Sequence, residues 1–157
     1  MKKALISWSG GKDSALALEQ VRREGRYDVV ALLTTVTEGS QRISMHGVRQ
    51  ALLEKQAERI GLPPAIVAIP QAADNESYEA RMAEVLERYK AQGVDTVIFG
   101  DLFLADVRAY REKQLARAGM DAVFPLWGRP TTEIVRDLTA RGYRAITTCV
   151  DGDVLPE

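Results

Sequence analysis

The residues whose types and spacing are best suited to bind a ligand or perform chemistry form one six-residue string near the start of the chain. Its members are Ser9, Gly10, Gly11, Lys12, Asp13 and Ser14. Adjacent glycines permit a positive φ and a close approach to a ligand, so their N–H groups can point into one concavity. Lys12 adds a mobile positive charge, and the two serines add hydroxyl donors. This set of donors is typical of a site that holds the pyrophosphate group of a nucleotide.

Asp13 narrows the kind of phosphate site, because a carboxylate repels phosphates unless a cation lies between them. We therefore expect Asp13 to hold Mg²⁺, with a helix cap as the alternative. It also occupies the place where the Walker pattern requires Ser or Thr, and the adjacent glycines do not match the G-x-G-x-x-G dinucleotide fingerprint. The competing interpretation of the whole string is a tight turn capped by Asp13 or Ser14, with Lys12 in solvent.

The elements that must position this string alternate between two kinds. Six short apolar or β-branched runs are predicted to be strands: Ala4–Trp8, Val29–Val36, Ala65–Ile69, Thr96–Phe99, Ala122–Phe124 and Ala145–Val150. Five longer periodic segments are predicted to be helices: Ser14–Glu24, Val48–Ile60, Glu76–Gln92, Asp106–Ala118 and Thr132–Arg141. This alternation predicts an α/β fold, a doubly wound and mainly parallel sheet of five or six strands with helices on both faces.

Residues that end and begin helices support these boundaries. Five glycines stand where C-terminal caps are expected: Gly25, Gly61, Gly93, Gly119 and Gly142. Asn75 and Thr131 stand where N-caps are expected. The longest irregular stretch, Thr37–His46, joins a predicted strand to a helix, and a loop of that length in a compact domain is often functional.

Composition sets the class of protein. The 157 residues fit a single domain, 1–157, and the 46% hydrophobic and 27% charged contents are those of soluble globular proteins. The net charge of −1 gives no support for a nucleic-acid partner. One cysteine, Cys149, excludes an internal disulfide, and no run approaches the roughly 20 apolar residues of a membrane span. We expect a cytoplasmic protein without membrane association, and an exposed edge strand would allow a homodimer.

The string at residues 9–14 resembles the SGG-x-DS signature of the PP-loop ATP pyrophosphatases. This resemblance implies an adenine nucleotide alpha hydrolase-like sheet with the strand order 3-2-1-4-5. It also implies that ATP is cleaved between its α and β phosphates, with Mg²⁺ bound. In that chemistry a substrate oxygen attacks the α-phosphorus, pyrophosphate leaves, and a nucleophile then displaces AMP from the adenylated intermediate.

Four further stretches resemble the diphthine–ammonia ligase-type branch of that family. They are Arg42–Arg49, Phe99–Asp101, Tyr110–Glu112 and Pro125–Gly128, and the resemblance extends from the region of Lys3 to the end of the chain. The form Ser-Met-His-Gly-Val-Arg is similar to bacterial members. The branch amidates the diphthine carboxylate of elongation factor 2. Because bacteria lack diphthamide, the resemblance implies ammonia and another carboxylate, on a small molecule or a protein, as partners. Members usually extend further at the C-terminus, so this domain is expected to lack an acceptor-side extension.

The implied strand order places Gly100 and Asp101, which follow the predicted strand Thr96–Phe99, opposite the string at residues 9–14. Ligands bind at the carboxyl ends of strands where the strand order reverses. We expect the Gly100 N–H to approach the α-phosphate and Asp101 to hold Mg²⁺ or the acceptor, with a loop glycine and a capping aspartate as the alternative. His46 is expected to contact the nucleotide or acceptor and to stabilise charge at the α-phosphorus, against a purely structural role.

Four residues further along the chain are candidates for binding the acceptor. Arg108 or Arg111 would bind its carboxylate, and Glu112 would orient the arginine. The alternative is a surface ion pair between Arg108 and Glu112, which are four residues apart on one predicted helix. Trp127 would either wall the acceptor pocket or belong to the core.

These expectations combine into an ATP-dependent ligase in which Lys12, Asp13 and His46 act on a carboxylate that ammonia then amidates. Two other functions fit the same residues: a non-catalytic ATP-binding sensor or interaction protein, and a PP-loop enzyme that modifies a nucleobase. The lone Cys149, far along the chain from the loop, argues against sulfur transfer. The sequence carries no glutaminase signature, so ammonia would come from solution or from a partner.

Overall fold

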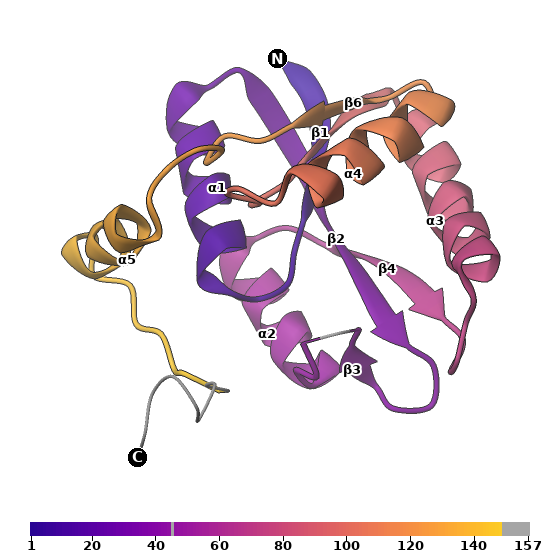
Figure 1. Cartoon of the computed structure of the whole chain (residues 1–157), viewed down its shortest axis with the longest axis horizontal. Coiled ribbons are helices and arrows are strands. Elements are labelled where there is room, and N and C mark those ends of the chain that lie inside the picture. Colours follow the sequence, from indigo (N-terminus) through magenta and orange to yellow (C-terminus); the bar gives the residue numbers. More distant parts are fainter. Residues whose placement is uncertain (45, 149–157) are drawn as a thin grey trace.

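A computed structural model describes residues 1–44 and 46–148, and Figure 1 shows its helices arranged around one twisted sheet. The strands are β1 (Lys2–Ser7), β2 (Tyr27–Thr37), β3 (Arg42–Ile43), β4 (Pro64–Ile69), β5 (Val94–Ile98) and β6 (Asp121–Val123). The helices are α1 (Lys12–Glu24), α2 (Gln50–Ile60), α3 (Asn75–Lys90), α4 (Ala105–Arg117) and α5 (Thr131–Ala140). The predicted α/β fold is confirmed.

The parallel strands of the sheet are ordered β4-β2-β1-β5-β6. Counted along the five strands predicted up to Phe124, this is the order 3-2-1-4-5. The order reverses between β1 and β5, so the ends of these two strands form the switch point at which ligands bind in open α/β sheets. The short strand β3 is an addition to the prediction. It runs antiparallel to the end of β2, with Val36 opposite Ile43, inside the stretch Thr37–His46 that the sequence analysis treats as irregular.

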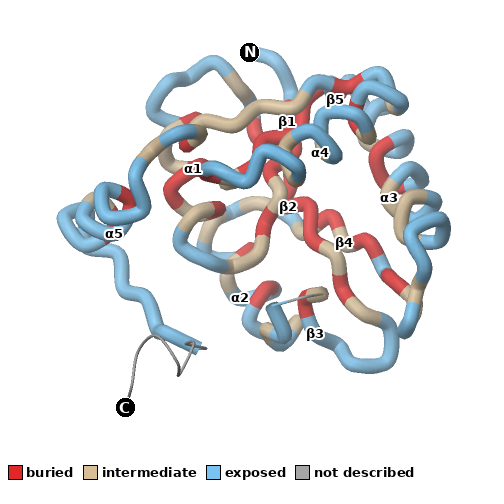
Figure 2. The backbone as a smooth tube through the Cα atoms, in the orientation of Figure 1, coloured by how far each residue is buried: buried red, intermediate tan, exposed pale blue. Residues whose placement is uncertain are grey.

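The central strands are buried on both faces, as Figure 2 shows by the red segments in the middle of the molecule. Alternate residues of β1 face opposite layers, so Ile6 packs with one group of side chains and Leu5 with another. On the first face the sheet packs against α1, α2 and α5, with Leu16, Leu53 and Ile134 in the core. On the second face it packs against α3 and α4. The helices thus cover both faces and leave the strand ends free to carry a site.

The predicted strand Ala145–Val150 is wrong for the part that the structure describes. Residues 145–148 have no strand geometry and are exposed, and Ile146 is 90% exposed. Figure 1 shows the cause, because α5 lies at one side of the molecule and the described residues that follow it, up to position 148, do not return to the sheet. An apolar run without a neighbouring strand has no hydrogen-bonding partner for its backbone. Positions 149 and 150, including Cys149, lie outside the described residues.

Two of the five predicted C-caps are confirmed, and both predicted N-caps are wrong by one residue. The C-caps of α3, α4 and α5 are Ala91, Ala118 and Arg141, and the predicted Gly93, Gly119 and Gly142 follow one or two residues later. Gly25 and Gly61 adopt the left-handed conformation directly after α1 and α2, as predicted. The N-cap of α3 is Asp74 rather than Asn75, and that of α5 is Pro130 rather than Thr131. Asp74 takes the position because its carboxylate accepts a 2.8 Å hydrogen bond from the Ser77 N–H, which is otherwise unpaired within the helix.

Replacing Asp74 with alanine is expected to lower the Tm by about 2–4 °C near neutral pH, because α3 loses its cap. Hydrogen bonding from Ser77 lowers the pKa of the Asp74 carboxyl below its ordinary value. A group with a lowered pKa stabilises the fold above its unfolded pKa, and this contribution is lost as the pH falls through the folded pKa. The Tm difference between wild type and Asp74→Ala should therefore narrow at acidic pH in thermal unfolding followed by circular dichroism.

The matched control is Asp74→Asn, because asparagine caps helices without titrating. Its Tm advantage over Asp74→Ala should stay constant across the same pH range. A wild-type advantage that also stayed constant to well below the ordinary aspartate pKa would contradict the assigned cap.

Candidate functional site

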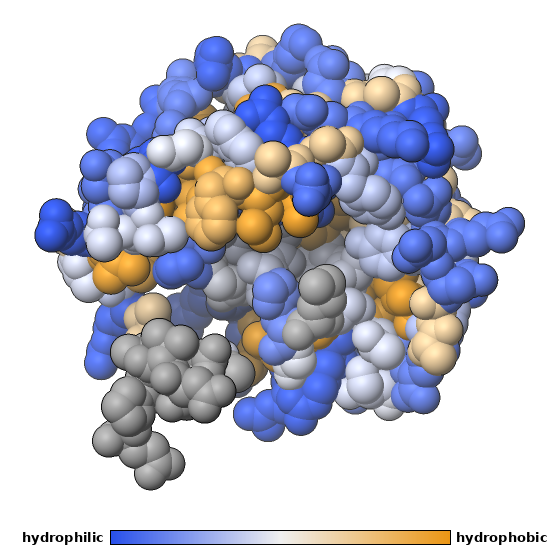
Figure 3. All heavy atoms as spheres, viewed as in Figure 1, coloured by the Kyte–Doolittle hydropathy of each residue, from blue (hydrophilic) through white to orange (hydrophobic). Residues whose placement is uncertain are grey.

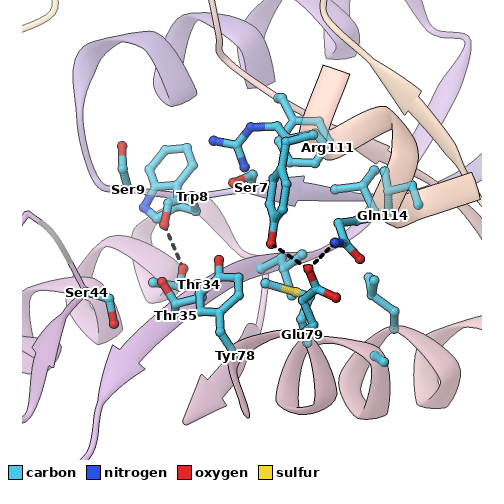
Figure 4. Close-up of a pocket in the computed structure, with 18 of the residues that line it drawn as sticks. Ser7, Trp8, Ser9, Thr34, Thr35, Ser44, Tyr78, Glu79, Arg111 and Gln114 are labelled. Carbon is cyan, nitrogen blue, oxygen red and sulfur yellow. Dashed lines mark hydrogen bonds between the residues drawn. The ribbon is translucent and has the colours of Figure 1, made fainter. Parts of the chain in front are cut away.

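A cavity of about 640 Å³ opens at the carboxyl ends of β1, β2 and β5 and continues between α3 and α4. Figure 4 shows its wall, with Trp8 and Ser9 at the end of β1, Tyr78 and Glu79 rising from α3, and Arg111 and Gln114 facing them from α4. The predicted site residues that line it are Ser9, Asp13, Ser14, His46, Gly100, Asp101 and Arg111. Gly10, Gly11 and Lys12 belong to the same turn but are not part of the cavity wall. Its volume is within the usual range of small-molecule sites.

The string at residues 9–14 forms the turn from β1 into α1. Gly10 has a φ of 79°, whereas Gly11 has a φ of −93° and is the N-cap of α1. Only the first glycine therefore uses the left-handed conformation. The Gly11 N–H donates to Ser9 Oγ at 3.3 Å, and the Ser14 hydroxyl donates to the Gly11 carbonyl at 3.0 Å. The turn thus brings the free N–H groups at the start of α1, with their partial positive charge, to the cavity.

Lys12 and Asp13 form an ion pair beside this turn. The Lys12 Nζ lies 2.9 Å from Asp13 Oδ2, and both side chains are about one-third exposed to solvent, at 39% and 34%. The competing interpretation offered Asp13 or Ser14 as the cap. Among the described residues, the Asp13 carboxylate accepts only from Lys12, and the Ser14 hydroxyl donates to the Gly11 carbonyl. Both charges are available to a ligand, because neither is held by any other partner among the described residues.

Gly100 packs directly against the first turn of α1. A Cβ atom built on Gly100 would lie 2.8 Å from the carbonyl carbon of Asp13 and 2.9 Å from the Ser14 nitrogen. These neighbours are backbone atoms, which cannot rotate away as a side chain can. Glycine is therefore required here by the close approach of two backbones, and the structure brings Gly100 and the turn at residues 9–14 together.

Asp101 pairs with Arg111 across the same wall. The Arg111 Nε lies 2.8 Å from Asp101 Oδ2, and the guanidinium stacks on the Phe99 ring with its carbon 4.5 Å from the ring centroid. Nε and Oδ2 are buried and form no hydrogen bond with each other or with another atom of the described residues. The pair is held by charge and by a hydrogen bond that Arg111 Nη2 donates to Asp101 Oδ1 at 3.4 Å. A guanidinium has five N–H groups, so Arg111 keeps further donors for a ligand in the cavity.

The other three residues expected to bind an acceptor lie together outside the cavity wall. The Arg108 guanidinium stacks between the rings of Phe124 and Trp127, at 4.9 and 4.7 Å from their centroids. Its Nε donates to Glu112 Oε1 at 2.8 Å. This arrangement matches the ion pair that the sequence analysis gave as the alternative. Exposed apolar residues Phe103 and Leu104 lead into α4, and Figure 3 shows hydrophobic atoms gathered on this face around the start of that helix.

Asp13 and Asp101 are the two predicted metal ligands, and both line the cavity. Within residues 1–44 and 46–148, no group of three or more His, Cys, Asp or Glu side chains forms a metal site by itself. Mg²⁺ in nucleotide sites uses one or two protein carboxylates and takes its other ligands from phosphates and water. Two carboxylates on one cavity, next to a turn suited to phosphates, fit that requirement.

Several residues of the cavity wall on α3 and α4 were not predicted from the sequence. Glu79 of α3 accepts hydrogen bonds from Gln114, from Tyr110 at 3.5 Å and from Arg117 at 3.2 Å, all on α4. Figure 4 shows Glu79 and Gln114 meeting across the cavity. Burial raises the pKa of Tyr78 and of Tyr110, so both phenols remain neutral near pH 7. Partners more than 30 residues apart leave no periodic signal in a sequence, although the spacing of Tyr110, Gln114 and Arg117 does place them on one helix face.

Comparison with known proteins gives one family and 15 similar chains among the solved structures, two of which are described here. Residues 1–122 match the family described as the diphthamide synthase N-terminal domain. No curated protein matches the chain. In the part of the chain that the structure describes, no helix is long and apolar enough to cross a membrane.

One similar structure is described as a predicted subunit of tRNA methyltransferase from Methanocaldococcus jannaschii, with a TM-score of 0.57 and 16% identity over 96% of this chain and 82% of the other. A second is the U34-tRNA thiolase NcsA from Methanococcus maripaludis with its [4Fe-4S] cluster, with a TM-score of 0.51 and 16% identity. The similarity covers 94% of this chain and 61% of the thiolase chain. At this identity the likeness establishes a shared fold.

Proposed function

We propose, on the premise that this chain belongs to the diphthamide synthase N-terminal domain family, that it is an ATP-dependent amide ligase. The family indicates an ATP-using modification enzyme of the PP-loop type. The finer proposal is that the enzyme resembles diphthine–ammonia ligases, adenylates a substrate carboxylate with release of pyrophosphate, and transfers the acyl group to ammonia. The acceptor is a carboxylate on a small molecule or a protein.

The observation that carries this proposal is the close approach of Gly100 to the backbone of the first turn of α1, at the ends of β1 and β5. These backbone atoms would form a cradle for the phosphates. Free N–H groups at the start of α1, together with Lys12, supply positive charge on one side of that cradle. A leaving pyrophosphate gains negative charge as its bond to the α-phosphorus breaks, and fixed donors at that position stabilise it.

The reaction requires two displacements whose atoms balance without a redox partner. A carboxylate oxygen of the acceptor bonds to the α-phosphorus, and the bond from that phosphorus to the bridging oxygen of pyrophosphate breaks. Ammonia then attacks the acyl carbon, AMP leaves, and the nitrogen loses a proton. Asp13 and Asp101 would hold Mg²⁺, which neutralises phosphate charge when bound. Lys12 and the Gly100 N–H would orient the phosphates, and His46 lies on the same cavity to stabilise charge.

Arg111 is the residue that would bind the acceptor carboxylate. It lines the cavity, its guanidinium carbon lies 4.5 Å from the Phe99 ring centroid, and its one hydrogen bond to Asp101, from Nη2, leaves other N–H groups for a ligand. A guanidinium binds a carboxylate through two parallel hydrogen bonds, which would set the attacking oxygen toward the nucleotide. Arg108, Glu112 and Trp127 would then support α4 from outside the cavity and would not contact the acceptor.

The test is to incubate the protein with ATP, Mg²⁺, ammonium and a panel of carboxylates, and to identify the phosphorus products by ³¹P NMR. AMP and pyrophosphate in equal amounts, with formation of an amide, are expected. ADP and phosphate would refute the proposal. ATP binding without AMP across the whole panel would favour a non-catalytic sensor.

A matched pair of variants tests the acceptor site in the same assay. Arg111→Gln should raise the KM for the acceptor by about 10-fold or more while the affinity for ATP changes little, because a charge-assisted contact is lost. Arg108→Gln, three residues away on α4 and outside the cavity, should leave both values close to wild type. Equal effects of the two substitutions would contradict the assignment of Arg111.

A PP-loop enzyme that modifies a nucleobase is the second candidate. It is favoured by the tRNA-related descriptions of both similar structures. Adding total tRNA to the assay separates the two functions, because release of AMP that depends on RNA and not on a carboxylate would support the second.

A further inference from the structure

The side chain of Gln56, on α2, lies between the end of β1 and the turn at residues 9–14. Its Nε2 donates to the Gly10 carbonyl at 3.2 Å, and its Oε1 accepts from the Trp8 indole Nε1 at 3.0 Å. Gln56, like Gly10 and Gly11, is not part of the cavity wall, whereas Ser9, Asp13 and Ser14 of the same turn are. We expect any effect of this residue on a nucleotide to act through the turn.

Trp8 determines which end of the Gln56 amide faces Gly10. An indole N–H can only donate, so the amide oxygen must face Trp8 and the NH₂ group must face the Gly10 carbonyl. Trp8 is itself fixed, since it is only 5% exposed and its carbonyl accepts a 2.8 Å hydrogen bond from the buried Thr34 hydroxyl, drawn in Figure 4. The orientation of the amide is thus set by a rigid neighbour.

The Gly10 carbonyl and the Gly11 N–H belong to one planar trans peptide and point in opposite directions. When Gln56 holds the carbonyl toward α2, the Gly11 N–H must point away from α2. It points into the turn, where Ser9 Oγ accepts it at 3.3 Å. Gly11 is the N-cap of α1, so this N–H stands at the positive end of the helix, beside the proposed pyrophosphate position.

The contact with Gln56 also explains why residue 10 is glycine. Its φ of 79° favours glycine, and a Cβ atom there would lie 2.9 Å from Gln56 Oε1. The side chain of Gln56 therefore occupies the space that a larger residue 10 would need. Adjacent glycines leave the intervening peptide free to rotate, and the opposite orientation would present a carbonyl oxygen to the phosphates.

We infer that Gln56 is a positioning residue for the phosphate turn, which fixes the Gly10–Gly11 peptide so that the Gly11 N–H faces the pyrophosphate portion of the nucleotide. This inference rests on the proposed function only in that the turn binds phosphates. It does not depend on the acceptor or on turnover.

The test is the affinity of the Gln56→Met variant for Mg·ATP, Mg·pyrophosphate and AMP, measured by isothermal titration calorimetry. Loss of an aligned donor to a charged group should weaken ATP and pyrophosphate about 10-fold or more, while AMP, which lacks the β and γ phosphates, should change less than about twofold. The control is Gln50→Met on the same helix. Among the described residues the Gln50 side chain bonds to Glu54 at the surface, so this variant should behave as wild type.

A second variant, Gln56→Glu, keeps the test decisive if Gln56→Met folds poorly. Gln56→Glu keeps the size of the side chain and its acceptor for Trp8, but it cannot donate to Gly10 near neutral pH. It should lose pyrophosphate affinity at least as strongly as Gln56→Met and should retain the Trp8 indole resonance near its wild-type position in a ¹H–¹⁵N spectrum.

Two outcomes would overturn the inference: unchanged pyrophosphate affinity in both variants, or equal loss of AMP and pyrophosphate, which marks a general structural defect. Failure of the proposed function is distinct, because it appears in the wild type as ATP binding without formation of AMP. In that case the phosphate-specific loss in the Gln56 variants is still expected.

Discussion

Alanine at position 100 should lower ATP-dependent turnover by about 100-fold or more, which is the cost of a misplacement of about 1 Å at a reacting centre. The added methyl would lie within 2.9 Å of the Asp13 and Ser14 backbone, so either β5 or the start of α1 must move. Overpacking of this kind also costs about 1–3 kcal/mol of stability. Turnover is measured by release of pyrophosphate, and stability by urea unfolding.

Gly61→Ala is the control for Gly100→Ala. Gly61 lies after α2 with no atom near its missing Cβ, but its φ of 75° makes alanine strained by about 1–2 kcal/mol. It should therefore destabilise the fold to a similar extent without affecting ATP. If Gly100→Ala binds and turns over ATP like Gly61→Ala, the close approach of the two backbones does not define the nucleotide site.

Neutralising Asp13 should change binding and turnover in opposite directions. In Asp13→Asn, Lys12 loses its partner and a negative charge leaves the phosphate site, so metal-free pyrophosphate should bind more tightly than to wild type. Turnover with Mg²⁺ should nevertheless fall by about 100-fold, because a proposed metal ligand is lost and the leaving group is less stabilised. Calorimetry with and without Mg²⁺, followed by the pyrophosphate assay, measures both effects.

Asp106→Asn provides a matched comparison. Asp106 is the second residue of α4, as Asp13 is the second residue of α1, but it is exposed and lies outside the cavity wall. Its neutralisation should alter neither pyrophosphate affinity nor the dependence on Mg²⁺. An Asp13→Asn variant with wild-type dependence on Mg²⁺ would remove Asp13 from the metal site.

The features that could be predicted from the sequence are those that depend on residues close together in the chain. The turn at residues 9–14 is continuous in the chain, and the periodic helices and apolar strands carry their own signals. The resemblance to PP-loop proteins supplied the strand order, which periodicity alone does not contain. The strand predicted at Ala145–Val150 failed over its described part because an apolar run becomes a strand only beside another strand, and the chain there has left the sheet.

The site required long-range contacts that the sequence does not show. Gln56 meets Gly10 across 46 residues, and its position on an apolar helical stripe gives no sign of a polar role. Arg108 and Arg111 lie three residues apart on one helix, so the sequence gives no reason to place one at the cavity and the other outside it. Their different aromatic partners determine these positions. Phe99 holds Arg111 at the cavity, whereas Phe124 and Trp127 hold Arg108 outside it.

The contacts of Glu79 have a consequence for how this fold can change over evolutionary time. The side of the cavity that we propose binds ATP is shaped by backbone atoms that meet at Gly100, where almost any exchange is disruptive. The other side is shaped by side chains that join α3 to α4 through one carboxylate. Exchanges of Glu79, Tyr110 or Gln114 would therefore alter the width and polarity of the groove while the nucleotide cradle is preserved. Related proteins could in this way bind different acceptors while the proposed ATP-binding part of the cavity stays unchanged.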